Sequence, residues 1–235
     1  MFHHMTFRAI PWFAILAIAF LSPAIAKSPA AGKKNQHQLR LVCVSSLAGN
    51  QEVVLASRNA KGKWKVLATT TLRNSLITDW LPAEDGELHL AVQEEGSLKS
   101  ICQFTLPADS RRAFAVLIAD PEQNSYEAQV VDPKKSEFAE GSVLICNFSE
   151  HPGLVFLGPT EERVEAGQQK SVKPTLEDNG TYRMMVSYID ADEKTVEAYD
   201  RQATGDPKSR EMLFLLPDKT LGLRVIGLPF FGSID

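Results

Sequence analysis

The chain has 235 residues, of which 44% are hydrophobic and 23% are charged, and its formal net charge at pH 7 is −4. This length and apolar content suit one large globular domain or two small ones. Because the chain is mildly acidic and its charges are scattered, nucleic acid and anionic lipid are disfavoured as main partners.

The first 26 residues have the pattern of a cleaved signal peptide. Arg8 supplies the positive charge, residues 10–21 form an apolar segment, and Ala24-Ile25-Ala26 is an A-x-A cleavage site. The apolar segment is too short to span a bilayer comfortably, so an uncleaved N-terminal anchor is the weaker alternative. We therefore expect an exported protein, periplasmic or extracellular, with no membrane span after cleavage. Residues 27–37 are small and polar and predict a flexible leader.

Residues 38–132 predict a first β-sandwich. Short apolar runs are separated by turn signals such as Glu84-Asp85-Gly86 and Asp120-Pro121. Their spacing of roughly ten residues is typical of all-β sandwiches and barrels. Residues 88–92 alternate in polarity, as in a strand with one buried face. Residues 114–119 are apolar throughout, which predicts a central strand that is covered on both faces.

Residues 133–141 predict a linker, and residues 142–235 predict a second β-sandwich. Residues 182–188 alternate in the same way after the Asp178-Asn179-Gly180 turn. Residues 212–216 are again apolar on both faces. The whole mature chain is therefore predicted to be all-β, with no helix of useful length.

The two predicted sandwiches repeat each other in sequence. Three matching segments occur in the same order, at offsets of 103, 94 and 98 residues. We therefore expect one strand order in both halves, with Cys43 equivalent to Cys146 and Leu88 equivalent to Tyr182. The matched segments are 40–46 with 144–149, 84–92 with 178–186, and 112–120 with 210–218.

The second sandwich carries a family resemblance. Its stretch from Asp178 through Gly180 and Tyr182 to Met184 resembles the D-x-G-x-Y-x-C stretch of immunoglobulin-type sandwiches, with Met184 in place of the Cys. The resemblance implies that the Tyr182 hydroxyl bonds to the upstream backbone, as in a tyrosine corner. Together with residues 165–174 and 210–218, this stretch also resembles exported bacterial proteins with two tandem immunoglobulin-like repeats, a group of uncharacterised proteins.

Three cysteines follow the signal peptide: Cys43, Cys102 and Cys146. Because an exported protein meets an oxidising compartment, a Cys43–Cys102 disulfide is one hypothesis. It would join two strands of the first repeat and leave Cys146 as the odd thiol. The other hypothesis is that all three are buried thiols that pack as small hydrophobic groups.

Residue types for catalysis or metal binding are scarce. After the signal peptide the histidines are His37, His89 and His151, and neither zinc-binding spacings nor a G-x-S-x-G motif occurs. His89 alternates out of phase with its apolar neighbours and is expected to face solvent. The acidic stretch 190–193 is interpreted as a solvated turn rather than a calcium loop. We therefore predict no catalytic residue, no metal site and no cofactor.

The remaining candidate for a functional surface is Trp64. It lies between Lys63 and Lys65 in a strand that could be a sheet edge, and aromatic residues are enriched in binding surfaces. Core packing is the alternative for Trp64, as for Trp80 and the tail aromatics. The leading hypothesis is a non-catalytic envelope or secreted module that binds a protein or polysaccharide through sheet edges or loops. A periplasmic chaperone-like or assembly protein is the alternative, and an enzyme with a dispersed site is the third.

Overall fold

The structure is a computed structural model that describes residues 37–134 and 136–230. The predicted signal peptide and all but the last residue of the predicted leader lie outside the described residues. The described residues form 17 β-strands and no helix, so the all-β prediction is confirmed. Among them, accordingly, no helix is long and apolar enough to cross a membrane.

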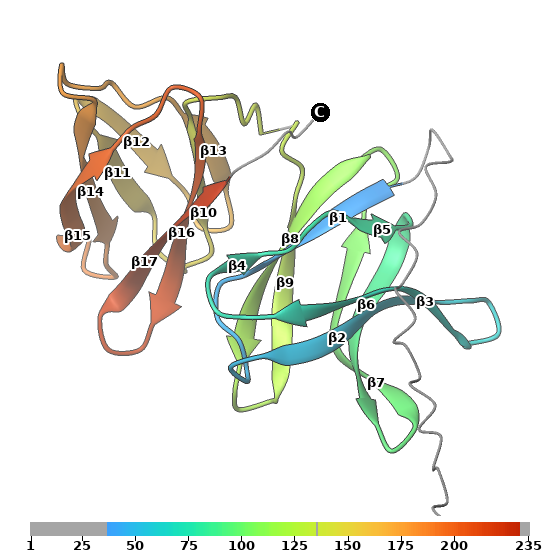
Figure 1. Cartoon of the computed structure of the whole chain (residues 1–235). Helices are drawn as coiled ribbons and strands as arrows, with labels where there is room; N and C mark the ends of the chain where they lie inside the picture. The colour runs from blue at the N-terminus through green and yellow to red at the C-terminus, as the bar shows by residue number, and fades with distance from the viewer. Residues whose placement is uncertain (1–36, 135, 231–235) are drawn as a thin grey trace, which may run out of the picture. The chain divides into compact units, whose positions relative to one another are not determined.

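The first repeat is a β-sandwich of two sheets, which we call sheet A and sheet B (Figure 1). Sheet A has the order β4-β1-β8-β9, and β5 also pairs with β1; sheet B has the order β3-β2-β6-β7. The strands of sheet A are β1 (His37–Cys43), β4 (Leu76–Ile77), β5 (Leu81–Ala83), β8 (Arg112–Asp120) and β9 (Ser125–Val131). Those of sheet B are β2 (Gln51–Arg58), β3 (Trp64–Leu72), β6 (Gly86–Glu94) and β7 (Ser97–Leu106).

The second repeat is a β-sandwich with the same strand order. Sheet C has the order β13-β10-β16-β17, and sheet D has the order β12-β11-β14-β15. In both repeats the first strand runs parallel to the penultimate one, as β1 with β8 and β10 with β16. The expectation of one strand order in both halves is therefore confirmed. The strands are β10 (Val143–Asn147), β11 (Gly153–Leu157), β12 (Thr160–Val164), β13 (Gln169–Val172), β14 (Thr181–Ile189), β15 (Thr195–Thr204), β16 (Arg210–Asp218) and β17 (Gly222–Phe230).

The two sandwiches share a third hydrophobic core besides their own two. The repeat 1 core lies between sheets A and B, and the repeat 2 core lies between sheets C and D. A separate cluster joins side chains of sheet A, such as Phe114 and Val116, to side chains of sheet C, such as Met212 and Phe214. We call this cluster the inter-repeat core. It explains why β8 and β16 are apolar on both faces, as predicted: each strand contributes to two cores.

The linker contributes to the inter-repeat core as well. Phe138 is only 1% exposed and packs with Phe230, whose ring centroid lies 6.0 Å away. Trp80 and Phe230 both pack against Phe114 in the same core. The expectation that Trp80 and the tail aromatics serve packing is therefore confirmed for these residues.

The expected equivalence of Cys43 and Cys146 is wrong by one residue. Cys43 pairs with Leu117 and points into the repeat 1 core, whereas Cys146 lies in the inter-repeat core. Val42 occupies the inter-repeat core in the first repeat, so Val42 is the equivalent of Cys146. The sequence match was one residue out of register, and such a slip turns a side chain to the other face of its strand. Leu88 and Tyr182, by contrast, both point into their own sandwich cores, as expected.

All three cysteines are buried free thiols in the structure. Burial raises the pKa of each thiol to about 12, so none is ionised near neutral pH. Cys43 and Cys102 lie in the same repeat 1 core, and their pairing stays a prediction.

Tyr182 is buried as predicted, but it forms a different hydrogen bond. Its side chain is 1% exposed in the repeat 2 core, and its hydroxyl donates to Glu211 Oε2 at 3.4 Å. The expected bond to the upstream backbone is not formed within the described part of the chain. The turn before Tyr182 is closed by the Gly180 N–H donating to the Glu177 carbonyl at 2.9 Å, and Gly180 has a φ of 78°. That left-handed conformation favours glycine; Asp178 is exposed in the same turn.

Candidate functional site

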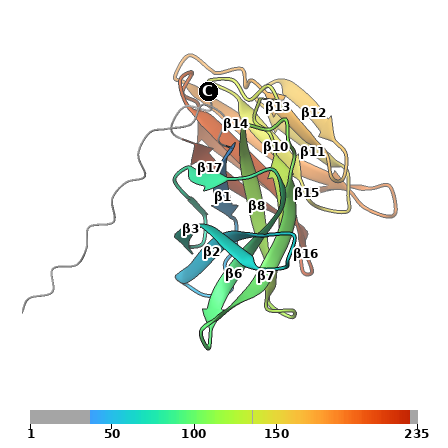
Figure 2. The same cartoon turned by 90° about the vertical axis from the view of Figure 1, so that its right-hand side faces the viewer.

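Trp64 lies at the start of β3, which is an edge strand of sheet B, as the sequence suggested. Its indole is half-buried on the outer face of the sheet. Figure 2 shows the strands of sheet B in a second view of the molecule. The Arg58 guanidinium lies over the ring, with Cζ 4.3 Å from the ring centroid. Arg58 and Trp64 are directly opposite each other on β2 and β3. A cation–π contact of this kind holds both side chains in one place.

His89 lies beneath Trp64, and the prediction that it faces solvent is wrong. It does point to the outer face of sheet B, but it is only 3% exposed. The Trp64 ring covers it edge-on, with the two ring centroids 5.1 Å apart. Alternation therefore predicted the correct face of the strand for His89. His89 is nevertheless buried, because the Trp64 side chain of β3 covers it.

Both nitrogens of His89 are hydrogen-bonded. Nδ1 lies 3.0 Å from Ser100 Oγ, and Nε2 lies 2.9 Å from Glu87 Oε1. The other oxygen of Glu87 accepts a bond from Gln103 Nε2 at 2.8 Å. This network fixes the imidazole, and the imidazole in turn supports the indole above it.

The Ser100–His89–Glu87 row contains the residue types of a nucleophilic triad. Such a triad needs a hydroxyl that gives its proton to the imidazole and oxyanion donors beside it. Here the Ser100 hydroxyl also lies 3.1 Å from the Cys102 carbonyl of its own strand, to which it donates. This second acceptor competes with the imidazole for the proton, and we assign the network a supporting role beneath Trp64.

A shallow depression lies beside this cluster. Its volume is about 690 Å³, and it is lined by Arg58 and by residues of the β6–β7 hairpin. Ser100 also lines it, so the network beneath Trp64 borders the depression. The lining residues from the hairpin are Glu94, Glu95, Ser97, Leu98, Lys99 and Ser100.

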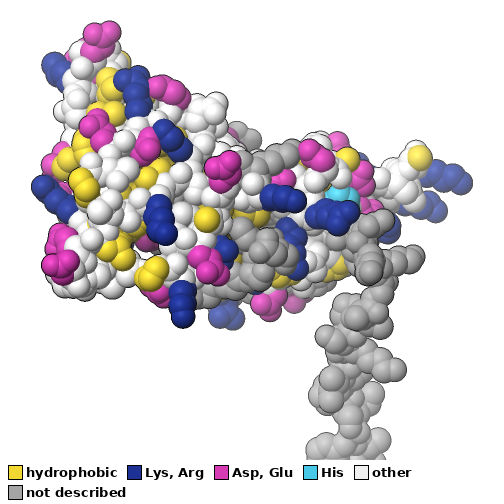
Figure 3. Space-filling view, turned by 90° about the horizontal axis from the view of Figure 1, so that it is seen from above, with side chains coloured by type: hydrophobic (Ala, Val, Ile, Leu, Met, Phe, Trp, Pro, Cys, Tyr) yellow, Lys and Arg dark blue, Asp and Glu magenta, His cyan; other side chains and the backbone are white. Residues whose placement is uncertain are grey.

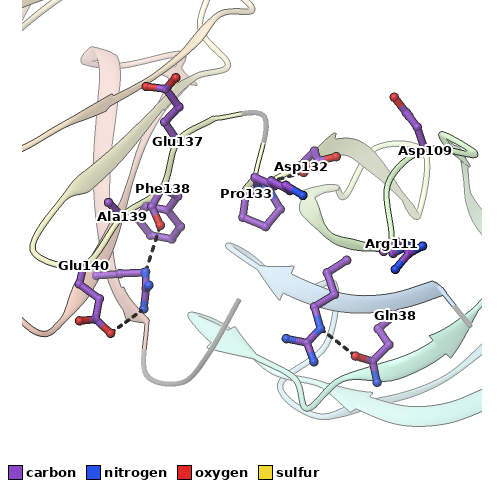
Figure 4. Close-up of a pocket in the computed structure, with 12 residues that line it drawn as sticks. Gln38, Asp109, Arg111, Asp132, Pro133, Glu137, Phe138, Ala139 and Glu140 are labelled. Atoms are coloured by element: carbon purple, nitrogen blue, oxygen red, sulfur yellow. Dashed lines mark hydrogen bonds and ion pairs between the residues drawn. The ribbon is translucent and has the colours of Figure 1, made fainter. Parts of the chain in front are cut away.

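A larger pocket of about 1080 Å³ lies where the two repeats and the linker meet, and we call it the junction pocket (Figure 4). Its walls come from the starts of β1, β8 and β16, from the loop before β8, and from the linker. Arg112 Nε donates to Gln38 Oε1 at 2.9 Å. Arg210 Nε donates to the Phe138 carbonyl at 3.0 Å. The lining residues are Gln38, Asp109, Arg111, Arg112, Asp132, Pro133, Lys134, Glu137, Phe138, Ala139, Glu140 and Arg210.

Sequence reasoning did not identify the junction pocket. A signal for it was present, because Arg112 and Arg210 are the first residues of one pair of matching segments. Each stands at the start of a strand that was predicted to be covered on both faces. What the sequence did not show is that sheets A and C pack against each other and bring these two positions together.

Other kinds of site find no support in the described part of the chain. No group of three or more His, Cys, Asp or Glu side chains there is placed to hold a metal ion. Charges of both signs are interspersed over the face seen in Figure 3, without a large patch of one sign.

The chain was also compared with known proteins. No model of a protein family matches it. No curated protein matches it significantly in sequence either.

Proposed function

We propose that the protein is a non-catalytic, exported binding module, and that its contact surface for a protein or polysaccharide partner is centred on Trp64. The observation that carries the proposal is the indole held between the Arg58 guanidinium and the His89 imidazole. Trp and Arg are the residue types that contribute most to binding energy in interfaces.

The support beneath Trp64 favours binding because it reduces the entropy lost on association. A side chain that is already fixed has less rotational freedom to lose when a partner arrives. Trp64 is fixed by its contacts with Arg58 and His89, and His89 is fixed by Ser100 and Glu87. The site is therefore preorganised through all four strands of sheet B.

The edge of β3 itself is poorly suited to the addition of a partner strand. The register of β2 with β3 shifts between Leu55 and Ala56, so β3 carries a bulge at Leu67. Bulges and edge lysines both hinder strand pairing, and Lys63 and Lys65 flank Trp64. We therefore propose that the partner contacts the outer face of sheet B through side chains.

The chaperone-like alternative is favoured by one observation, which is the edge strand β17. Its nine residues pair with β16 in an unbroken register, and it includes Leu223, Val225 and Leu228. An unbroken edge is the feature that a partner strand needs for β-augmentation. Pro229 cannot donate a hydrogen bond and limits such pairing near the end of β17.

Binding by immobilised mature protein to polysaccharide arrays and to proteins of the cell envelope tests the proposal. We expect Trp64→Ala to abolish capture of any partner that the wild type binds. Leu221→Ala is the matched control, because Leu221 is a 66% exposed hydrophobic residue of the second repeat, away from sheet B. Retention of every partner by Trp64→Ala would contradict the proposal, and loss in Ile226→Pro alone would favour strand addition at β17.

A further inference from the structure

The turn between β2 and β3 carries a concentration of positive charge. Residues 58–65, which we call the basic hairpin, contain four basic side chains and no acidic one, although the whole chain has a net charge of −4. The basic residues are Arg58, Lys61, Lys63 and Lys65. Figure 1 shows this turn at one end of sheet B. Basic runs of about five to eight residues are typical of surfaces that bind anionic polymers, so the basic hairpin is a candidate contact for a polyanion.

Three of these four cations have no carboxylate partner in the described part of the chain. Lys65 forms an ion pair with Glu84. Among residues 37–134 and 136–230, by contrast, no carboxylate lies within ion-pair distance of Arg58, Lys61 or Lys63. All three side chains are exposed. Their charges are therefore open to an anionic group that arrives from solution.

The turn that carries the lysines is held in one conformation by Asn59. Its Oδ1 accepts the backbone N–H of Lys61 at 2.9 Å and that of Lys63 at 3.0 Å. The Gly62 N–H donates to the Asn59 carbonyl at 2.8 Å, and Gly62 has a φ of 72°, which favours glycine. A backbone that is already fixed loses less entropy when a partner binds. The turn therefore presents its cations from a fixed frame beside Trp64.

Protection of a sheet edge explains only part of this charge. Lysines on an edge strand hinder the pairing of further strands, and Lys63 and Lys65 stand at the start of the edge strand β3. Arg58, however, lies on β2, which pairs with strands on both sides, and Lys61 lies in the turn itself. Edge protection therefore does not account for Arg58 or Lys61.

The surroundings of Trp64 favour a narrow polyanion over a folded protein surface. Lysine is depleted in protein–protein interfaces, whose centres are apolar. Trp64 has a lysine on each side in the sequence, and Val66 is the exposed apolar residue next along the strand. Glu94 and Glu95 line the depression beside Arg58. A broad anionic surface would meet these carboxylates and be repelled, whereas a single extended chain can follow the hairpin and avoid them.

We propose that the basic hairpin and Trp64 bind an acidic polysaccharide, a chain whose sugars carry carboxylate or sulfate groups. This inference rests on the binding function proposed for Trp64 and names the class of its partner. The Arg58 fork matches a carboxylate, and the ammonium groups of Lys61 and Lys63 act as point charges toward either anion. Because all three cations are exposed, salt should screen the attraction strongly.

Retention of the mature protein on immobilised polymers tests the proposal. The probes are polygalacturonate and dextran sulfate, with neutral dextran and polyglutamate as comparisons. We expect retention on at least one acidic polysaccharide at low salt, release by sodium chloride, and no retention on dextran. Equal retention on polyglutamate would show a general affinity for polyanions and would overturn the choice of a polysaccharide. Retention on dextran alone, or on none of the polymers, would also overturn the proposal.

Variants then locate the contact. Lys61→Gln and Lys63→Gln should each weaken binding to the retained polysaccharide about threefold at low salt, and the double variant about tenfold. The matched control is the double variant Lys173→Gln with Lys208→Gln, which removes the same charge from exposed positions of the second repeat. Equal weakening in both double variants would contradict the assignment to the hairpin. Polysaccharide binding that requires Trp64 but neither hairpin lysine would overturn this inference and leave the proposed function standing.

Discussion

The two repeats have the same strand order but differ in the chemistry of one end of their cores. In repeat 1, β8 places Ala113 in the core, and the equivalent of Tyr182 is Leu88. In repeat 2, β16 places Glu211 at that point, where its carboxylate accepts the Tyr182 hydroxyl. The two repeats therefore bury the same face of each strand, but repeat 2 has a polar pair, Tyr182 and Glu211, where repeat 1 has an apolar pair, Leu88 and Ala113.

The edge strand next to this pair, β9 in repeat 1 and β17 in repeat 2, also differs between the two repeats. Val130 of β9 pairs with Ala115 of β8. At the equivalent point of repeat 2, Gly227 of β17 pairs with Leu213 of β16. A side-chain carbon added to Gly227 would lie 2.5 Å from Glu211 Oε1. The small Ala113 thus accompanies a large Val130, and the large Glu211 accompanies a glycine. The total side-chain volume at this position is therefore similar in the two repeats although the chemistry is not.

The largest effect should come from removing the tyrosine ring. Tyr182→Ala leaves a cavity and deprives Glu211 of its hydrogen-bond donor, so we expect a loss of about 3–5 kcal/mol in the free energy of unfolding. Tyr182→Phe should lose about 1 kcal/mol, the value of one hydrogen bond. Arg183→Ala, on the exposed side of the same strand, should barely move a urea midpoint. Equal damage from Arg183→Ala and Tyr182→Ala would show that the strand faces are assigned wrongly.

A second contrast concerns cysteine, because only the first repeat has two cysteines in one core. Cys43 and Cys102 are free thiols in the structure, and the hypothesis under test is that they form a bridge in an oxidising compartment. The bridge should contribute about 4 kcal/mol. Thiol labelling of unfolded, non-reduced protein should then find one free cysteine, Cys146. Three labelled cysteines would mean that the thiols stay free, as in the structure.

Giving positions 211 and 227 of repeat 2 the residues found in repeat 1 should have an intermediate effect on the free energy of unfolding. Gly227→Val places a side-chain carbon against the Glu211 carboxylate, which must move away from the Tyr182 hydroxyl, and we expect a loss of about 1 kcal/mol, the value of that hydrogen bond. Adding Glu211→Ala, which restores the combination found in repeat 1, should recover part of that loss. A double-mutant cycle in urea measures the coupling. Additive losses would mean that Glu211 and Gly227 do not constrain each other.

The smallest effect is a pH dependence from Glu211. Burial raises its pKa; the Arg201 charge and the Tyr182 hydrogen bond oppose this, and Tyr199 also lies close to Arg201. A carboxyl whose folded pKa is raised stabilises the fold fully below its unfolded pKa, and this contribution is lost as pH rises through the folded pKa. Glu211→Gln should therefore gain stability relative to wild type from pH 4 to pH 7. Urea melts that give the same stability difference between Glu211→Gln and wild type at pH 4 and at pH 7 would contradict this.

Several of these features could be predicted from sequence, because they depend on neighbours along the chain. Alternation identified the buried faces of Leu88 and Tyr182, and the unbroken apolar runs identified β8 and β16 as covered on both sides. The register of Cys43 could not be predicted as safely, since one residue of misalignment reverses a side chain. The burial of His89 and the meeting of Arg112 with Arg210 depend on side chains from other strands and sheets, which sequence patterns do not locate.

The inter-repeat core is the feature that makes one unit of the two sandwiches, and hydrogen exchange in sub-denaturing urea tests it most directly. We expect the slowest amides of β6 in repeat 1 and of β14 in repeat 2 to exchange with the same free energy of opening. Phe114→Ala, which removes a fully buried ring from the inter-repeat core, should lower both values together by about 3–5 kcal/mol. Two different free energies in the wild type, with only β6 affected by Phe114→Ala, would show that the repeats unfold independently and would contradict the account.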